Sequence, residues 1–211
     1  MISNPSIYQI FNRLWQQNPE PVGELEHHNL YTLLVAVVLS AQATDKGVNL
    51  ATRSLFTKIK TPQDMLDLGL EVLTAHIASI GLYRAKAKNI MALSQILVKD
   101  HVGKVPSNRE ALMALPGVGR KTANVVLNIG WQQPVMAVDT HVFRLSHRLG
   151  LSKGKTVELV EEDLMRVIPA EFMLHAHHWL ILHGRYICQA RKPKCGICII
   201  ADLCSFEGKQ L

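Results

Sequence analysis

The sequence has 211 residues, of which 48% are hydrophobic and 19% charged, and this balance excludes disordered and fibrous chains. Its formal net charge is +6. The longest apolar run, residues 30–39, is about half as long as the roughly 20 residues that a bilayer-spanning helix needs, so we expect no membrane association. The N-terminal residues show no secretory signal pattern, which predicts a cytoplasmic protein.

Helical periodicity runs through the chain, whereas strand patterns are nearly absent. Short clusters of turn residues, such as Lys60-Thr61-Pro62, separate the periodic segments. The expected helices span residues 4–17, 30–44, 46–59, 71–79, 84–99, 108–114, 119–129, 140–149, 156–167 and 171–186. Short helices with short connections predict an all-α fold.

Basic residues gather in two stretches that contain no acidic residue. The members are Arg84, Lys86, Lys88 and Lys99 in the first stretch, and Arg185, Arg191, Lys192 and Lys194 in the second. Such clustering suits a polyanion such as nucleic acid. Solvated helix faces produce the same pattern, so charge alone leaves DNA binding open.

Residues 115–123, Leu-Pro-Gly-Val-Gly-Arg-Lys-Thr-Ala, join two expected helices. Gly117 and Gly119 permit positive φ and close backbone approach, and the second helix begins with free amides, so a phosphate can bind here. The alternative is a glycine-containing helix turn without a ligand. Arg120 and Lys121 oppose the dipole of the second helix, and residues placed against their local preference favour a functional site.

Asp139 directly precedes the expected helix at 140–149, where an aspartate first indicates an N-cap. The four cysteines, Cys188, Cys195, Cys198 and Cys204, all lie in the last 24 residues. Thiols this close in sequence favour a metal centre over disulfides. Zinc and a 4Fe-4S cluster both stay open, and the single short C-x-x-C pair modestly favours the cluster.

The hairpin, the sequence Val138-Asp139-Thr140-His141 and the C-x6-C-x2-C-x5-C spacing together resemble the endonuclease III family of helix-hairpin-helix DNA glycosylases. The resemblance implies a two-lobed, all-α fold. A six-helix barrel domain would cover residues 21–133, with the helix-hairpin-helix motif at about 108–129. Residues 1–20 and 134–211 would form a discontinuous domain that holds a 4Fe-4S cluster on the four cysteines.

The resemblance also implies base excision repair by a monomer that binds damaged double-stranded DNA and associates with the nucleoid. Oxidised or ring-fragmented pyrimidines would be removed, and the abasic site would then be cleaved by β-elimination. Lys121 would be the nucleophile, with burial, Arg120 and the helix N-terminus favouring its neutral amine. Asp139 would be the essential carboxylate, stabilising positive charge at the sugar and moving protons to and from Lys121.

The resemblance further implies a set of DNA contacts: Gln42, Leu82, Gly117, Val118, Gly119, Arg120, His141, Arg191, Lys192 and Lys194. Gln42 and Leu82 would fill the space left by an extruded nucleotide. The last three residues would face phosphates. His141 is expected chiefly to support the local structure.

Three alternatives compete with this interpretation. A mismatch glycosylase shares the hairpin and the cluster but lacks the lysine. A non-catalytic DNA-binding module would bind without chemistry, and a zinc-stabilised interaction protein would contain zinc instead of iron. The histidines at 175, 177, 178 and 183 are expected to have packing and capping roles in their helix rather than to bind a metal.

Overall fold

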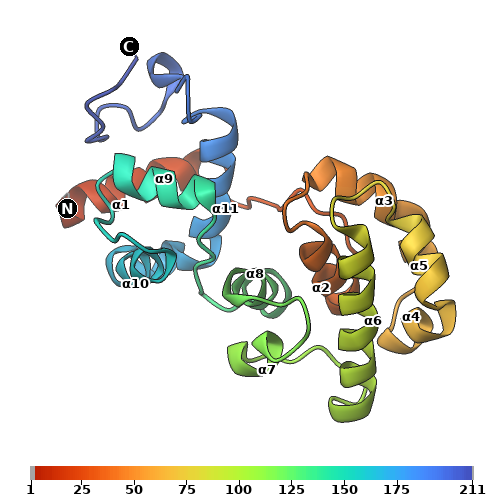
Figure 1. Ribbon diagram of the computed structural model, residues 1–211. Coiled ribbons are helices and arrows are strands. Elements are labelled where there is room, and N and C mark those ends of the chain that lie inside the picture. The colour runs from red at the N-terminus through yellow and green to blue at the C-terminus, as the bar shows by residue number, and fades with distance from the viewer. Residues whose placement is uncertain (1–2, 211) are drawn as a thin grey trace. The chain divides into compact units, whose positions relative to one another are not determined.

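The computed structural model describes residues 3–210, in which all regular elements are helices (Figure 1). The predicted all-α class is therefore confirmed. The elements are α1 (Asn4–Gln17), α2 (Leu30–Leu39), α3 (Asp45–Lys58), α4 (Pro62–Leu68), α5 (Leu70–His76), α6 (Tyr83–Asp100), α7 (Arg109–Met113), α8 (Arg120–Trp131), α9 (Thr140–Arg148), α10 (Val157–Val167), α11 (Ala170–Tyr186) and the 3-10 helix η1 (Cys195–Ile197).

The chain divides into two compact units. One unit spans Glu24–Gln132 and contains α2 to α8. The other combines the N-terminal residues up to Gly23 with the residues from Gln133 onward, so α1 packs with α9, α10 and α11. None of the helices described here has the length and apolar character that crossing a bilayer requires.

The unit Glu24–Gln132 is built around α2, in which every residue from Tyr31 to Leu39 is buried. Helix α2 contacts α3, α6 and α8, and a helix that is apolar all round requires such neighbours. Its first turn is fixed by a capping box between Asn29 and Thr32. The apolar run is thus the centre of this core.

Two expectations about this unit were wrong. The helix expected at 30–44 ends at Leu39, because the Ala43 amide donates to the Ser40 carbonyl and Gln42 has a φ of 55°. Helix α4 was not expected, although Thr61 and Asp64 form a capping box around Pro62 at its start. The segment interpreted as a break is therefore also a helix start.

The second unit has its own core, to which α1 contributes Ile7, Ile10, Phe11 and Leu14. Helix α1 also reaches the cysteine-containing segment, since Arg13 Nη1 donates to the Ile199 carbonyl at 2.8 Å and to Asp202 Oδ1 at 2.6 Å. The Trp179 indole of α11 donates to the Asn18 carbonyl at 2.7 Å. The two ends of the chain are thereby joined in one unit.

Candidate active site and metal centre

The hairpin between α7 and α8 is a tight turn that ends in the exposed first turn of α8. The Val118 amide donates to the Leu115 carbonyl at 3.1 Å, and the Val118 side chain is buried. Val118 therefore shapes the turn, and neither its side chain nor its amide is left for a ligand. Gly119 is the N-cap residue of α8, so the amides that follow it are those without partners inside the helix.

Only one of the two hairpin glycines is required by the local backbone. Gly117 has a φ of 80°, and a Cβ there would lie 3.0 Å from Asn89 Nδ2. Gly119 has a φ of −89°, which any residue adopts, and a Cβ there would meet no atom within 4 Å. The expectation of positive φ therefore holds for Gly117 and is wrong for Gly119. The backbone at 119 does not force a glycine, although glycine is among the residues that helix N-caps prefer.

Lys121 is the second residue of α8, and its side chain is exposed. The expectation that burial favours its neutral amine is wrong for the chain described here. Arg120 precedes it at the helix N-terminus, so the positive surroundings expected from the sequence are present.

Asp139 is the N-cap residue of α9, as predicted. Its Oδ1 accepts a hydrogen bond from the Val142 amide at 2.8 Å, which fixes the carboxylate at the start of the helix. The carboxylate is half-buried. A capped, partly desolvated carboxylate has a fixed direction and interacts more strongly with a nearby positive charge than one in water.

Helix α9 connects this aspartate to the cysteine segment. The half-buried His141 places Nδ1 3.2 Å from Arg144 Nη2, and the same guanidinium donates to the Gly184 carbonyl at 2.8 Å and the Cys188 carbonyl at 3.1 Å. Gly184 permits this packing, since a Cβ there would lie 2.9 Å from His141 Cβ. His141 therefore supports the local structure, as expected.

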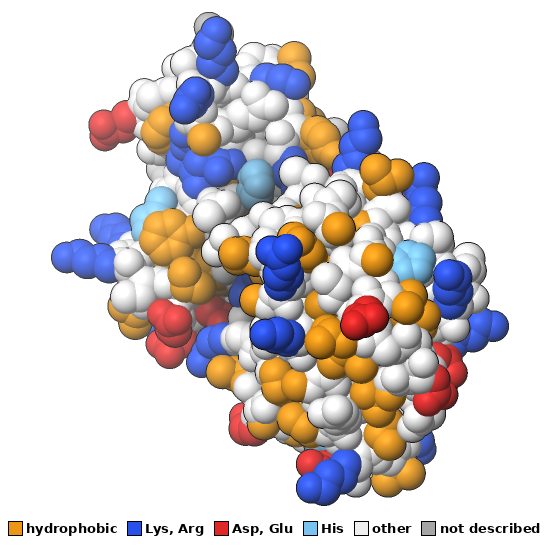
Figure 2. Space-filling view, turned by 45° about the vertical axis from the view of Figure 1, so that its right-hand side comes forward, with side chains coloured by type: hydrophobic (Ala, Val, Ile, Leu, Met, Phe, Trp, Pro, Cys, Tyr) orange, Lys and Arg blue, Asp and Glu red, His pale blue; other side chains and the backbone are white. Residues whose placement is uncertain are grey.

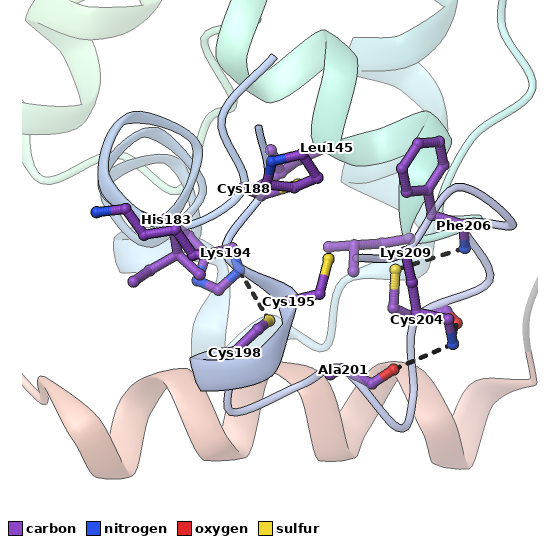
Figure 3. A pocket seen from close by; sticks show the side chains of 13 residues that line it. Leu145, His183, Cys188, Lys194, Cys195, Cys198, Ala201, Cys204, Phe206 and Lys209 are labelled. Atoms are coloured by element: carbon purple, nitrogen blue, oxygen red, sulfur yellow. Dashed lines mark hydrogen bonds between the residues drawn. The ribbon is translucent and has the colours of Figure 1, made fainter. Parts of the chain in front are cut away.

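The four cysteines line one pocket, to which Leu145, Leu149, Pro193 and Ile187 add apolar walls (Figure 3). All four are free thiols of intermediate exposure. Burial raises the pKa of the Cys198 thiol and the Cys204 thiol, and the neighbouring cysteines raise both further. Binding of iron must therefore displace protons from these groups.

Several hydrogen-bonding groups contact the sulfurs. Arg148 Nη1 donates to Cys188 Sγ at 3.3 Å, the Phe206 amide donates to Cys204 Sγ at 3.5 Å, and His183 Nε2 lies 3.4 Å from Cys198 Sγ. Burial lowers the pKa of His183 to about 4, so its ring is neutral near pH 7. Such donors stabilise iron-bound thiolates and tune a cluster's potential.

The donor set fits the 4Fe-4S cluster expected from the cysteine spacing. Among residues 3–210, no group of three or more His, Cys, Asp or Glu side chains is arranged to hold one metal ion. In a 4Fe-4S cluster each cysteine binds a different iron, so the thiolates need not converge on one point. A shared pocket, four thiols and donors to the sulfurs meet this requirement.

Sequence reasoning missed Arg144, Arg148 and His183. Arg148 Nη1 and Nη2 also donate to the Gln189 carbonyl at 2.9 Å and the Ala190 carbonyl at 2.8 Å, and its guanidinium lies 4.4 Å from the centre of the Phe206 ring. The only signal in the sequence was the spacing of Arg144 and Arg148, which puts both on one face of a helix.

Gln42 and Leu82 share an unusual backbone conformation. Their φ values are 55° and 60°, in the left-handed region that residues other than glycine seldom adopt. Both side chains are exposed, Leu82 by 63%. The loops that carry them are adjacent, because a Cβ on Gly81 would lie 3.8 Å from the Gln42 carbonyl oxygen. Strained backbone often accompanies a functional site.

The basic residues divide into exposed and buried members. Arg84, Lys88, Lys99 and the loop residues Arg191, Lys192 and Lys194 are exposed. Lys86, a member of the first basic stretch, is buried. On the face shown in Figure 2, Lys and Arg side chains are scattered and acidic side chains are fewer. The excess of basic side chains suits binding of a polyanion, although these side chains do not form one continuous patch on that face.

Two family models match this chain. One, described as HhH-GPD superfamily base excision DNA repair protein, matches residues 35–170, and the other, the iron-sulfur binding domain of endonuclease III, matches residues 188–204. Endonuclease III of Haemophilus influenzae is 56% identical over 201 residues, with 95% of each chain covered. Endonuclease III of Escherichia coli strain K12 is 55% identical with the same coverage.

Solved structures give the same result. A trapped covalent intermediate of endonuclease III with DNA matches with a TM-score of 0.90 and 46% identity, covering 97% of each chain. A thermostable thymine-DNA glycosylase matches with a TM-score of 0.83 and 24% identity, covering 96% of this chain and 97% of the other, which shows a shared fold.

Proposed function

Because the chain belongs to the endonuclease III family, whose members are base excision repair DNA glycosylases and abasic-site lyases with a 4Fe-4S cluster, we propose that Lys121 is its nucleophile and Asp139 its essential carboxylate. The observation that carries the proposal is the exposed amine at the second position of α8, directly after a hairpin glycine that local structure does not require. A relative 46% identical to this chain forms a covalent intermediate with DNA, as an enzyme with an amine nucleophile does.

The amine and the carboxylate divide the chemistry. The neutral Lys121 amine attacks C1′ of the sugar, the glycosidic bond breaks, and the base leaves with the bonding electrons and takes up a proton. The sugar ring opens to a Schiff base between C1′ and Nζ. A proton then leaves C2′, the C3′–O bond breaks, and the phosphate departs. Water hydrolyses the imine and regenerates Lys121.

Asp139 supports two of these steps. Its carboxylate accepts the proton that the Lys121 ammonium must lose, and its negative charge stabilises positive charge that develops at the sugar. The hydrogen bond from Val142 holds the carboxylate in a fixed direction.

The remaining residues bind DNA and hold the cofactor. The amides that begin α8 bind a phosphate of the damaged strand beside Gly117, Gly119 and Arg120. The cluster, held by the four cysteines, fixes the loop so that Arg191, Lys192 and Lys194 face phosphates. The cluster has a structural role, because neither base excision nor β-elimination involves net electron transfer. Gln42 and Leu82 occupy the space of the extruded nucleotide.

The substrate class and the cellular setting complete the proposal. The enzyme removes oxidised or ring-fragmented pyrimidines from double-stranded DNA, acts as a monomer, and works in the cytoplasm at the nucleoid. The barrel domain is assigned to residues 21–133 and the cluster domain to residues 1–20 with 134–211. Lesion-containing duplexes that each carry one damaged base test the substrate class directly.

Borohydride reduction tests the catalytic roles. Wild-type protein incubated with abasic-site DNA and borohydride should give a covalent adduct, and Lys121→Ala should give none. Lys58→Ala, which removes an exposed lysine of α3, is the matched control and should react like wild type. An undiminished adduct with Lys121→Ala contradicts the proposal, and DNA binding without any adduct supports a non-catalytic binding module instead.

A further inference from the structure

Lys86 in α6 is a buried cation that takes no part in the proposed reaction. Only 6% of it is exposed, and lysine is seldom buried unless it has a partner. Its Nζ donates a hydrogen bond to the Leu39 carbonyl oxygen at 2.9 Å. Burial lowers the pKa of the ammonium group. A charged side chain kept in this position must satisfy a specific need of the surrounding backbone.

That need arises at the end of α2. The amide that would continue the helix by donating to Leu39 belongs to Ala43, and it donates to the Ser40 carbonyl at 3.1 Å instead. The Leu39 carbonyl therefore depends on a donor from elsewhere, which Lys86 provides. A cation at a helix C-terminus also interacts favourably with the helix dipole.

The same residue is bonded to the second loop through its backbone. The Lys86 amide donates to the carbonyl of Leu82 at 3.0 Å, and Leu82 is the N-cap residue of α6. Lys86 thus donates one hydrogen bond to the base of the Gln42 loop and another to the base of the Leu82 loop. Each loop carries one exposed non-glycine residue with a left-handed backbone conformation, Gln42 in the first loop and Leu82 in the second.

We propose that Lys86 is a positioning residue that holds the end of α2 against the start of α6, so that Gln42 and Leu82 enter the DNA duplex together. The inference rests on the proposed role of these two side chains in replacing the extruded nucleotide. Strained loop conformations persist only where their surroundings hold them. Without the Lys86 side chain the α2 loop relaxes, and the two wedging groups lose their common orientation.

A purely structural cap would behave differently. It would lower the stability of the protein and its activity on every substrate alike. A positioning role predicts a loss that depends on how firmly the target base is stacked, because extrusion costs least for a base that is already unpaired. The comparison of a paired and an unpaired target therefore separates the two roles.

The test uses full-length, cluster-loaded protein with Lys86→Met, Lys86→Gln and Lys86→Arg. Lys58→Met, which changes an exposed lysine of α3 outside both basic stretches, is the control. Excision is measured on one damaged pyrimidine in a fully paired duplex and on the same lesion inside a mismatched bubble. Extrusion is followed by the fluorescence of a 2-aminopurine next to the lesion, in a Lys121→Gln background that cannot react.

Lys86→Met should lose about tenfold or more of the excision rate on the paired duplex and less than about threefold on the bubble, because only the paired target needs the wedge for extrusion. The fluorescence rise should fall in parallel. Lys86→Arg should recover most of both signals, and Lys86→Gln, which keeps a neutral donor, should be intermediate. Unfolding midpoints identify any variant that fails to fold, in which case Lys86→Gln carries the comparison.

Three results overturn the inference, and they can be told apart. An equal loss on the paired duplex and the bubble means that Lys86 is only a structural cap. A normal fluorescence rise in Lys86→Met, together with a reduced rise in Leu82→Ala, overturns the role of Lys86 and leaves the wedge intact. A normal rise in Leu82→Ala means that the wedge assignment itself is wrong, and the inference fails with it.

Discussion

Alanine substitutions at the two hairpin glycines should differ in their effects on stability and on DNA binding. At Gly117 the φ of 80° is unfavourable for alanine by roughly 1–2 kcal/mol. The new Cβ would also lie 3.0 Å from Asn89 Nδ2, so that side chain must shift. Gly117→Ala should therefore lower the free energy of unfolding by about 1–3 kcal/mol.

At Gly119 no comparable loss of stability is expected. Its φ of −89° suits alanine, and a Cβ would meet no atom within 4 Å. Gly119→Ala should change the free energy of unfolding by less than about 1 kcal/mol, because the restriction of the unfolded chain by alanine is offset by the preference for glycine over alanine at a helix N-cap. The methyl group would, however, occupy the space in front of the amides of α8 where a phosphate is expected to bind.

Urea unfolding and DNA binding together check this pair. Gly119→Ala should bind a duplex with an abasic-site analogue about tenfold more weakly than the parent, which corresponds to roughly 1.4 kcal/mol. Gly117→Ala should show its main loss in the urea midpoint. If Gly119→Ala binds DNA as tightly as the parent, the open space at Gly119 is not a phosphate site and the reasoning about the hairpin is wrong.

Three further predictions follow from local geometry. Asp139→Asn should keep the N-cap and the stability of α9 but lose excision, whereas Asp139→Ala should also lose about 1 kcal/mol in urea unfolding; equal destabilisation by both changes would contradict this. Val102 has a φ of 52°, which is unfavourable for valine, so Val102→Asn should raise the free energy of unfolding by about 1 kcal/mol. A lower free energy of unfolding in this variant would contradict the assignment of backbone strain to Val102. Burial and then His175 lower the pKa of His178 to about 4, so the folded state resists a proton that the unfolded state binds near pH 6.5. Stability should therefore fall between pH 6.5 and 4 by about 3 kcal/mol from this group, and a His178→Asn variant should show a correspondingly smaller slope.

Local signals in the sequence were sufficient for the features that depend on neighbouring residues. The Asp139 cap, the hairpin turn at Gly117 and the start of α8 each follow from residues within one helical turn. The cysteine spacing indicated a shared metal centre, and the four thiols do line one pocket. The start of α4 had the same kind of local signal in Thr61 and Asp64 and was nevertheless overlooked.

Features that depend on distant contacts were not predictable in this way. The burial of Lys86 arises from a carbonyl 47 residues earlier, and Arg148 contacts a sulfur 40 residues later. The early end of α2 at Leu39 was also missed, because apolar periodicity gives no sign of the turn at Ser40 to Ala43 or of the Lys86 donor to the Leu39 carbonyl. The exposure of Lys121 was also missed, since its expected burial was inferred from the chemistry and not from its neighbours.

Mass spectrometry of the reduced adduct tests the central claim most directly. Wild-type protein is incubated with abasic-site DNA and borohydride, the adduct is digested, and the peptide that carries the added sugar is sequenced. The account predicts that the modification lies on Nζ of Lys121. A modification on another lysine or on the N-terminal amine would contradict it, whatever the activity of the Lys121 variants.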